Sequence, residues 1–325
     1  MAKKKDGKGW NEAFPGIDEI CTTFSSYKGL VHASNIIAKV GGASNSEKYR
    51  KREDKLKKLI GAYTEYLKGQ LAIADGIVDF RSDKLSEEQI EHVNSNIEKR
   101  VKLLNDYYDT FADINIEGDG DEYYDSRSKI RSTVLEEFMF LLFREFVDSI
   151  AGTGKKKLLK NGSTKAYSNL FFTASDINEF VKDPSIQINT KNQDYAIYRE
   201  VKIALEGSGK APCKASIPIL AIEDKTYLDK TMLEGAIATA EKIKMGAPYS
   251  VFVVVTETYA VDNSVDPAYS RIDQIFVLRK CKDADRANNA ISVDVVQNLF
   301  WFVVERIMRP WFDIEKKLHN SGTII

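Results

Sequence analysis

The stretch Ile217-Pro-Ile-Leu-Ala-Ile-Glu-Asp-Lys225 decides how this chain is expected to fold. Its continuous apolar run is typical of a strand buried by its neighbours, yet the run ends in three charged residues. Because side chains alternate along a strand, Glu223 and Lys225 should lie on one face. A second predicted strand, residues 194–205, begins with a carboxylate. The two strands together predict a cluster of Asp194, Glu223 and Lys225.

These residue types suit metal-dependent hydrolysis. Carboxylates bind a hard divalent ion such as Mg²⁺, which prefers oxygen ligands and keeps several waters. Such an ion stabilises charge in a phosphoryl transition state and lowers the pKa of a bound water. We expect Asp194, Glu223 and Asp224 to be the metal ligands, with the backbone carbonyl of residue 224 as a further candidate, and Lys225 to orient the water or neutralise the phosphate. The charged triplet alone is a weak signal, because it also suits an ion pair at a surface strand end.

Two longer stretches carry a resemblance to a known family. They are Asn192-Gln-Asp-Tyr-Ala-Ile-Tyr-Arg-Glu200 and Ile222-Glu-Asp-Lys-Thr-Tyr-Leu-Asp-Lys-Thr-Met-Leu-Glu234. Both resemble the PD-(D/E)XK nucleases and, more narrowly, the BbvCI-like group of Type II restriction endonucleases. The resemblance covers residues 125–280 and does not extend to the first hundred residues. Two departures are that no proline precedes Asp194 and that position 224 is Asp rather than a small or apolar residue.

The resemblance implies a fold and an activity. The fold is α/β (α+β), with a helical N-terminal region and a restriction-endonuclease-like core whose central mixed β-sheet is flanked by helices. The activity is Mg²⁺-dependent, site-specific hydrolysis of double-stranded DNA within a restriction–modification system. Since one such centre cuts one strand, the chain is expected to form a homodimer or a heterodimer with a second nuclease subunit.

Two alternative functions stay open. The first is a DNA repair or recombination nuclease of the same fold. The second is a non-catalytic DNA-binding subunit of a nuclease complex. The intact set of Asp194, Glu223 and Lys225 argues against the second alternative, whereas the unusual Asp224 leaves room for it.

Composition limits these functions. The chain has 325 residues, 43% of them hydrophobic and 29% charged, as in ordinary globular proteins. Its net charge is −1, so any DNA-binding surface must be a local concentration of Lys and Arg. Three scattered cysteines favour free thiols in a reducing cytoplasm. The start of the sequence does not resemble a secretory signal, and no run reaches the length of a membrane span, so we expect a cytoplasmic protein without membrane contact.

The N-terminal part is predicted to be mainly helical. Apolar residues at helical spacing indicate one helix from Ser46 and another opened by the capping box Ser86-Glu-Glu-Gln89. Basic residues crowd the first turns of the earlier helix and form either a solvated face or a phosphate contact. The acidic, Gly-containing residues 117–125 are predicted to be a linker. We therefore predict an N-terminal region for DNA or subunit contacts, residues 1–125, and a nuclease domain, residues 126–325.

A strongly apolar helix is predicted at the start of the nuclease domain, over residues 132–143. It contains two adjacent carboxylates, Glu136 and Glu137. The resemblance implies that a Glu on this helix faces the metal site, and Glu136 is the slightly preferred candidate for this catalytic position. The alternative is a carboxylate favoured by the dipole at the helix N-terminus.

The strongest local basic stretch is residues 152–165. Flexible glycines would let backbone N–H groups approach phosphates, and lysines would add affinity through counterion release. The alternative is an ordinary solvated loop. The candidate DNA-binding residues of this stretch, together with one on the next predicted helix, are Lys155, Lys156, Lys157, Lys160, Asn161, Lys165 and Lys230.

The remaining elements complete the predicted core. A helix over residues 228–245 should connect the strand of Glu223 to a buried parallel strand, residues 249–256. A further strand is predicted over residues 272–278, and an apolar helix over residues 293–308 that stops before Pro310.

Overall fold

The computed structural model describes residues 12–27, 29–45, 52–74, 78–82, 84–114, 130–151, 158–309, 311 and 313–322. Four described helices precede the core of the fold: α2 (Ile17–Ser26), α3 (Val31–Asn45), α5 (Glu53–Ala72) and α6 (Glu87–Asp113). The helix predicted from Ser46 is α5, and its predicted first residues lie outside the described part. The capping box at α6 is formed, because Gln89 N–H donates to Ser86 Oγ (3.2 Å) and Ser86 N–H to Gln89 Oε1 (2.9 Å).

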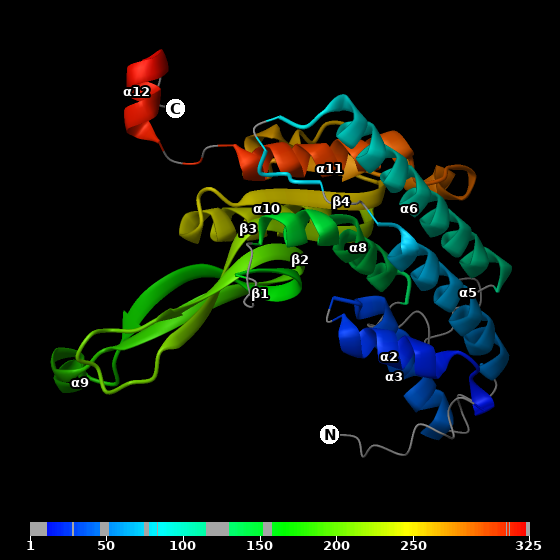
Figure 1. The fold of residues 1–325 in the computed structure, drawn as a ribbon. Coiled ribbons are helices and arrows are strands. Elements are labelled where there is room, and N and C mark those ends of the chain that lie inside the picture. The colour runs from blue at the N-terminus through cyan, green and yellow to red at the C-terminus, as the bar shows by residue number, and fades with distance from the viewer. Residues whose placement is uncertain are drawn as a thin grey trace.

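A five-stranded mixed sheet forms the core, in the order β1-β2-β3-β4-β5. The first two pairs of neighbours are antiparallel and the last two are parallel. The strands are β1 (Leu159–Thr173), β2 (Ser185–Ile203), β3 (Cys213–Leu228), β4 (Val251–Tyr259) and β5 (Gln274–Val277). The predicted mixed sheet flanked by helices is therefore confirmed (Figure 1).

Helices cover both faces of this sheet. They are α8 (Ser132–Ile150), α10 (Lys230–Gly246) and α11 (Val293–Met308). Helices α9 (Ile177–Lys182) and α12 (Ile314–Ser321) lie away from these faces (Figure 1), and two short 3₁₀ turns are η1 (Pro267–Tyr269) and η2 (Asp283–Asn288). On one face, α8 and α11 pack on the sheet through Phe143, which stacks on Phe300 (5.6 Å between ring centroids) and on Tyr195 (5.9 Å). On the other face, α10 covers a smaller apolar cluster that includes Ala221 and Val254.

The predicted loop over residues 152–165 is corrected by the structure. Residues 159–165 belong to β1, while Lys155, Lys156 and Lys157 lie outside the described residues. The strand forms because β1 pairs with β2 along most of its length, a long-range interaction that overrides the loop-like local sequence.

A long projection leaves the sheet at β1 and β2, with α9 near its end (Figure 1). We call it the arm; it comprises residues 164–193 and 199–217. The end of β1 and the start of β2 form one hairpin, and the end of β2 and the start of β3 form another. A bridge between Ala166 and Ser216 and a hydrogen bond from Cys213 Sγ to the carbonyl of Ile186 (3.2 Å) hold the two hairpins together.

The N-terminal helices share one apolar core with α8 and the sheet. At their contact, the fully buried Glu137 of α8 accepts hydrogen bonds from the backbone N–H groups of His32 (2.9 Å) and Ala33 (3.1 Å) and from the Tyr63 hydroxyl (2.7 Å). A carboxylate thus satisfies two donors in the first turn of α3. The predicted domain boundary at residue 125 falls outside the described residues and stays a prediction.

Replacing Glu137 with Ala should lower the free energy of unfolding by about 2–4 kcal/mol, because three buried donors lose their acceptor. Urea unfolding near neutral pH measures this change. Glu136→Ala is the matched control, because it removes the adjacent carboxylate, whereas the α3 donors bind Glu137. This variant should unfold at the same urea concentration as the wild type or at a higher one. Equal destabilisation by both variants would contradict the assigned role of Glu137.

Candidate active site

The register of β2 against β3 brings the predicted cluster together. Tyr195 pairs with Ile222 in this antiparallel register, so the preceding residue, Asp194, lies opposite Glu223. The Lys225 ammonium nitrogen lies 3.0 Å from Glu223 Oε1 and 3.5 Å from Asp194 Oδ2. It also donates to the backbone carbonyl of Asp224 (3.3 Å), whose N–H donates to Asp194 Oδ2 (2.9 Å). Three oxygens therefore converge on one positive charge.

These side chains are sheltered but reachable from solvent. Asp194 is 34% exposed, Glu223 21% and Lys225 22%. Burial lowers the pKa of Lys225, but the carboxylates of Asp194 and Glu223 outweigh burial and leave the pKa above its usual value. The ammonium thus stays charged beside the two carboxylates.

Glu136 of α8 belongs to the same group. Burial, together with the charge of Asp194, raises the pKa of Glu136 to about 8, and Lys225 opposes this rise. Glu137, in contrast, is turned to the N-terminal helices. Glu136 therefore interacts electrostatically with Asp194 and Lys225, whereas Glu137 binds donors of the N-terminal helices.

The side chain of Asp224, the third predicted carboxylate ligand, lies apart from those of Glu223 and Lys225. This side chain points to the opposite face of the sheet from Glu223 and Lys225, because consecutive strand residues alternate, and it is 7% exposed. Neither carboxyl oxygen has a hydrogen-bond partner among the described residues. Burial, and then the charges of Asp194 and Glu136, raise the pKa of Asp224 well above its usual value. This geometry favours the backbone carbonyl of Asp224 over its side chain as a metal ligand.

The candidate DNA-binding residues that the structure describes are dispersed. Lys165 is exposed on β1 across from Asn192, two residues before Asp194. Lys160 is exposed on the same strand and forms an ion pair with Glu200. The side-chain nitrogen of Asn161 is buried, so this residue does not present a donor to base edges. Lys230 is exposed in the first turn of α10, next to the N-cap residue Asp229.

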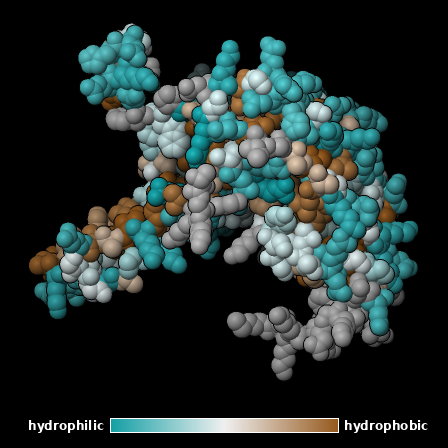
Figure 2. Space-filling view, viewed as in Figure 1, coloured by the Kyte–Doolittle hydropathy of each residue, from teal (hydrophilic) through white to brown (hydrophobic). Residues whose placement is uncertain are grey.

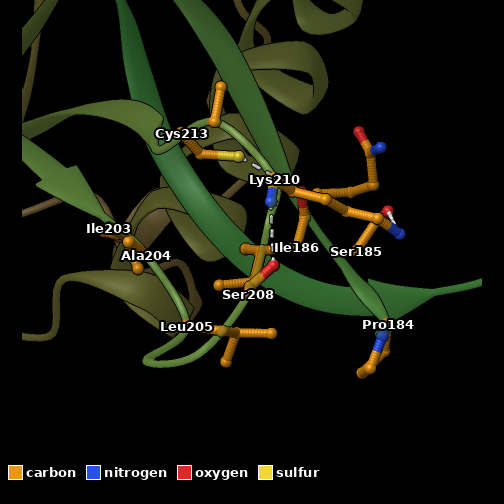
Figure 3. A pocket seen from close by; sticks show the side chains of 11 residues that line it. Pro184, Ser185, Ile186, Ile203, Ala204, Leu205, Ser208, Lys210 and Cys213 are labelled. Atoms are coloured by element: carbon orange, nitrogen blue, oxygen red, sulfur yellow. Dashed lines mark hydrogen bonds between the residues drawn. The ribbon is translucent and has the colours of Figure 1, made fainter. Parts of the chain in front are cut away.

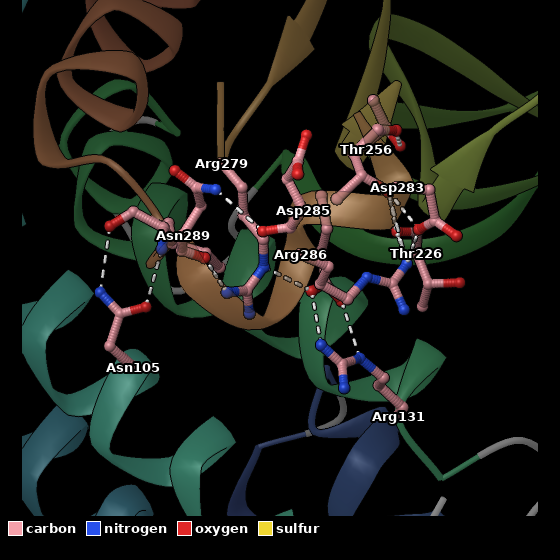
Figure 4. A network of polar contacts seen from close by, with 12 residues as sticks. Asn105, Arg131, Thr226, Thr256, Arg279, Asp283, Asp285, Arg286 and Asn289 are labelled. Carbon is pink, nitrogen blue, oxygen red and sulfur yellow. Dashed lines mark hydrogen bonds and ion pairs between the residues drawn. The ribbon is translucent and has the colours of Figure 1, made fainter. Parts of the chain in front are cut away.

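Sequence reasoning missed the residues that fix the end of β3. Arg286 donates to the carbonyl of Thr226, directly after Lys225, at 2.5 Å and forms an ion pair with Asp283 (2.9 Å). Nearby, the fully buried Glu257 accepts from Arg131 (2.8 Å) and Arg279 (2.9 Å) (Figure 4). Burial raises the pKa of Glu257, but the two guanidinium groups outweigh burial and leave the pKa below its usual value. Asp283 and Arg286 are close in sequence, but only the tertiary fold brings Arg286 to Thr226 and the two other arginines to Glu257.

The comparisons with known proteins identify a family. A family model for the Bpu10I restriction endonuclease matches residues 127–297, more than half of the chain. The chain belongs to the Bpu10I restriction endonuclease family. The matched part of this family member contains Glu136, Asp194, Glu223 and Lys225.

A solved structure shares the fold of this Bpu10I-family chain. It is described as the native BbvCI A2B2 tetramer at low resolution. The TM-score is 0.62 at 18% sequence identity, and the match covers 88% of this chain and 99% of that chain. The predicted resemblance to BbvCI-like restriction endonucleases is thus confirmed. No curated protein sequence matches the chain.

Two absences hold for the described part of this Bpu10I-family chain. No described helix is both long and apolar enough to cross a bilayer. No three His, Cys, Asp or Glu side chains in the described ranges stand together as metal ligands. A Mg²⁺ site does not need three such side chains, because this ion commonly uses one or two carboxylates and several waters. The oxygens of Asp194, Glu223 and the Asp224 carbonyl already surround one cationic group, so their donor set fits such an ion.

Replacing Asp224 with Asn should stabilise this family member more at alkaline than at acidic pH. The pKa of the Asp224 carboxyl is higher in the folded state than in the unfolded state, so wild-type stability falls as pH rises between the two values. Asn removes this penalty while keeping the shape of the protonated carboxyl. Melting temperatures of metal-free protein at about pH 4 and about pH 8 measure the difference. If the melting temperatures of Asp224→Asn and wild type differ by the same amount at both pH values, Asp224 is not held protonated in the folded state.

Proposed function

We propose that this chain is a Type II restriction endonuclease that hydrolyses phosphodiester bonds of double-stranded DNA at a specific site, with Mg²⁺ as cofactor. The observation that carries the proposal is the convergence of Asp194, Glu223 and the Asp224 carbonyl on the Lys225 ammonium. A divalent ion in such a site supplies charge stabilisation and a water of lowered pKa. Asp194 and Glu223 would hold it.

In this proposal the protein groups share the work of positioning and charge balance. Lys225 orients the attacking water or neutralises the scissile phosphate, because it donates several hydrogen bonds from a point charge. Glu136 adds a proton-exchanging group beside Asp194, since its pKa of about 8 lies near neutral pH. The intact set argues for a catalytic chain rather than a vestigial binding subunit.

A double-strand break at one site needs two such centres, and this chain carries one Asp194–Glu223–Lys225 set among its described residues. The partner is a second copy or an unlike nuclease subunit; the structurally similar BbvCI is described as an A2B2 tetramer. We propose that this chain likewise acts within a multimer on DNA.

The decisive experiment is plasmid cleavage with Mg²⁺, comparing wild type with Lys225→Ala and Glu223→Gln. Each variant should lose roughly 10²- to 10⁴-fold in rate, the usual contribution of a positioned proton-transfer or charge-stabilising group. Chelation of the metal should abolish cleavage by the wild type. Lys68→Ala, an exposed lysine of α5, is the matched control and should cleave normally.

The products decide between the alternatives. Discrete linear fragments indicate site-specific cutting by the chain alone, and nicked circles indicate a missing partner subunit. Cleavage by Lys225→Ala at the wild-type rate would refute the active-site assignment. No cleavage of any DNA by the wild type would favour a binding subunit.

Lys165 is expected to contact a phosphate, because it is exposed and lies two residues along the sheet from Asp194. Lys165→Ala should weaken DNA binding similarly for all sequences and reduce the slope of log affinity against log salt by about one. Fluorescence anisotropy over a salt series measures this slope, again with Lys68→Ala as control. A loss confined to one DNA sequence would instead indicate base readout.

A further inference from the structure

The end of the arm exposes an unusual amount of apolar surface. Five large apolar residues lie within a short stretch, and each is at least 44% exposed: Phe171 44%, Phe172 54%, Ile177 70%, Phe180 51% and Val181 78%. Figure 2 shows hydrophobic residues at this free end, away from the body of the molecule. Single exposed apolar residues are normal, but several on one short segment, three of them on α9, are typical of an interaction surface.

The cluster lies on a well-tied support. Asp176 caps α9 by accepting from the N–H groups of Asn178 (2.8 Å) and Glu179 (2.9 Å). Lys210, from the neighbouring hairpin, donates to Glu179 (2.9 Å), to the carbonyl of Asp183 (2.7 Å) and to the hydroxyl of Ser185 (2.6 Å). Figure 3 shows Lys210 and Ser185 beside the pocket between the two hairpins. The apolar side chains are therefore presented in a fixed arrangement, which lowers the entropic cost of binding.

The charges around the cluster indicate which partner fits. Residues 174–184 carry three carboxylates and one lysine, and Lys210 pairs with one of these carboxylates, so this end of the arm has no excess of basic residues that would favour contact with DNA phosphates. On α9, Ile177, Phe180 and Val181 have the spacing of one helix face. An exposed acidic residue, Asp176, stands at one end of this stripe and an exposed basic residue, Lys182, at the other.

This pattern is complementary to itself. If two α9 helices lie antiparallel about a two-fold axis, the apolar stripes face each other and Asp176 of each copy lies next to Lys182 of the other. A two-fold interface of this kind uses the same patch on both subunits. We infer that the end of the arm is a self-association surface, through which two copies of this chain pair by antiparallel contact of α9.

Sedimentation of the full chain, without metal or DNA, tests this pairing independently of nuclease activity. Wild type should dimerise at micromolar concentration, and Val181→Glu should be monomeric, with a dissociation constant at least about tenfold higher. Met245→Glu is the matched control: it places the same charge at a residue 71% exposed on α10, far along the chain, and should dimerise like wild type. Circular dichroism confirms that both variants are folded, as expected for exposed positions.

Cysteine cross-linking tests the orientation. In an antiparallel pair, residue 177 of one copy faces residue 181 of the other. A mixture of Ile177→Cys and Val181→Cys proteins should therefore form disulfide-linked dimers faster than either variant alone, with wild type as control for its own three cysteines. The inference is overturned if wild type stays monomeric, if Val181→Glu dimerises like wild type, or if each cysteine variant alone cross-links faster than the mixture.

Discussion

The whole candidate active site depends on the register between β2 and β3. That register is fixed by apolar side chains: Tyr195, Ile197 and Ile222 are fully buried against the helices on one face of the sheet. A slip of one residue would turn every side chain of a strand to the opposite face and would bury Asp194 in the core. Core packing therefore sets the distance between Asp194 and the Glu223–Lys225 pair, although the catalytic candidates themselves contribute little to the core.

Helix α8 links this site to the N-terminal helices through adjacent carboxylates. Successive residues of a helix point in different directions, so Glu136 can face Asp194 while Glu137 caps α3. The environments also explain the opposite behaviour of the buried carboxylates. Burial raises the pKa of Glu137 to about 7, because the neutral donors that bind it only partly oppose the effect of burial. Glu257 is also buried, but its two guanidinium partners outweigh burial and leave its pKa below the usual value. Full charge on a buried carboxylate is thus maintained only where arginines compensate its desolvation.

The sequence predicted those elements whose local pattern agrees with their tertiary setting. The buried strands, α8, α10 and α11 have apolar spacing that also describes how they pack. It did not predict β1, because the glycines and lysines before Lys165 are typical of a loop and only pairing with β2 makes them a strand. A signal for α9 was present, since Asp176-Ile-Asn-Glu179 has the spacing of a capping box, and Glu179 accepts from Ser175 N–H at the start of the helix.

The same distinction applies to function. Alternation along one strand was enough to place Glu223 and Lys225 together, the carboxylate that opens the neighbouring predicted strand supplied Asp194, and family resemblance supplied the Glu on α8. Alternation also implies that the Asp224 side chain points away from these two residues. The burial of that side chain depends on residues of other elements, which no local sequence pattern reveals. The apolar stripe of α9 poses the reverse problem. From sequence alone, Ile177, Phe180 and Val181 have the spacing of a buried helix face, and hydrophobicity cannot distinguish burial within one chain from burial between two. Only the projection of the arm shows that the stripe stays exposed in the described part of the chain, and a second copy would supply the burial that the pattern indicates.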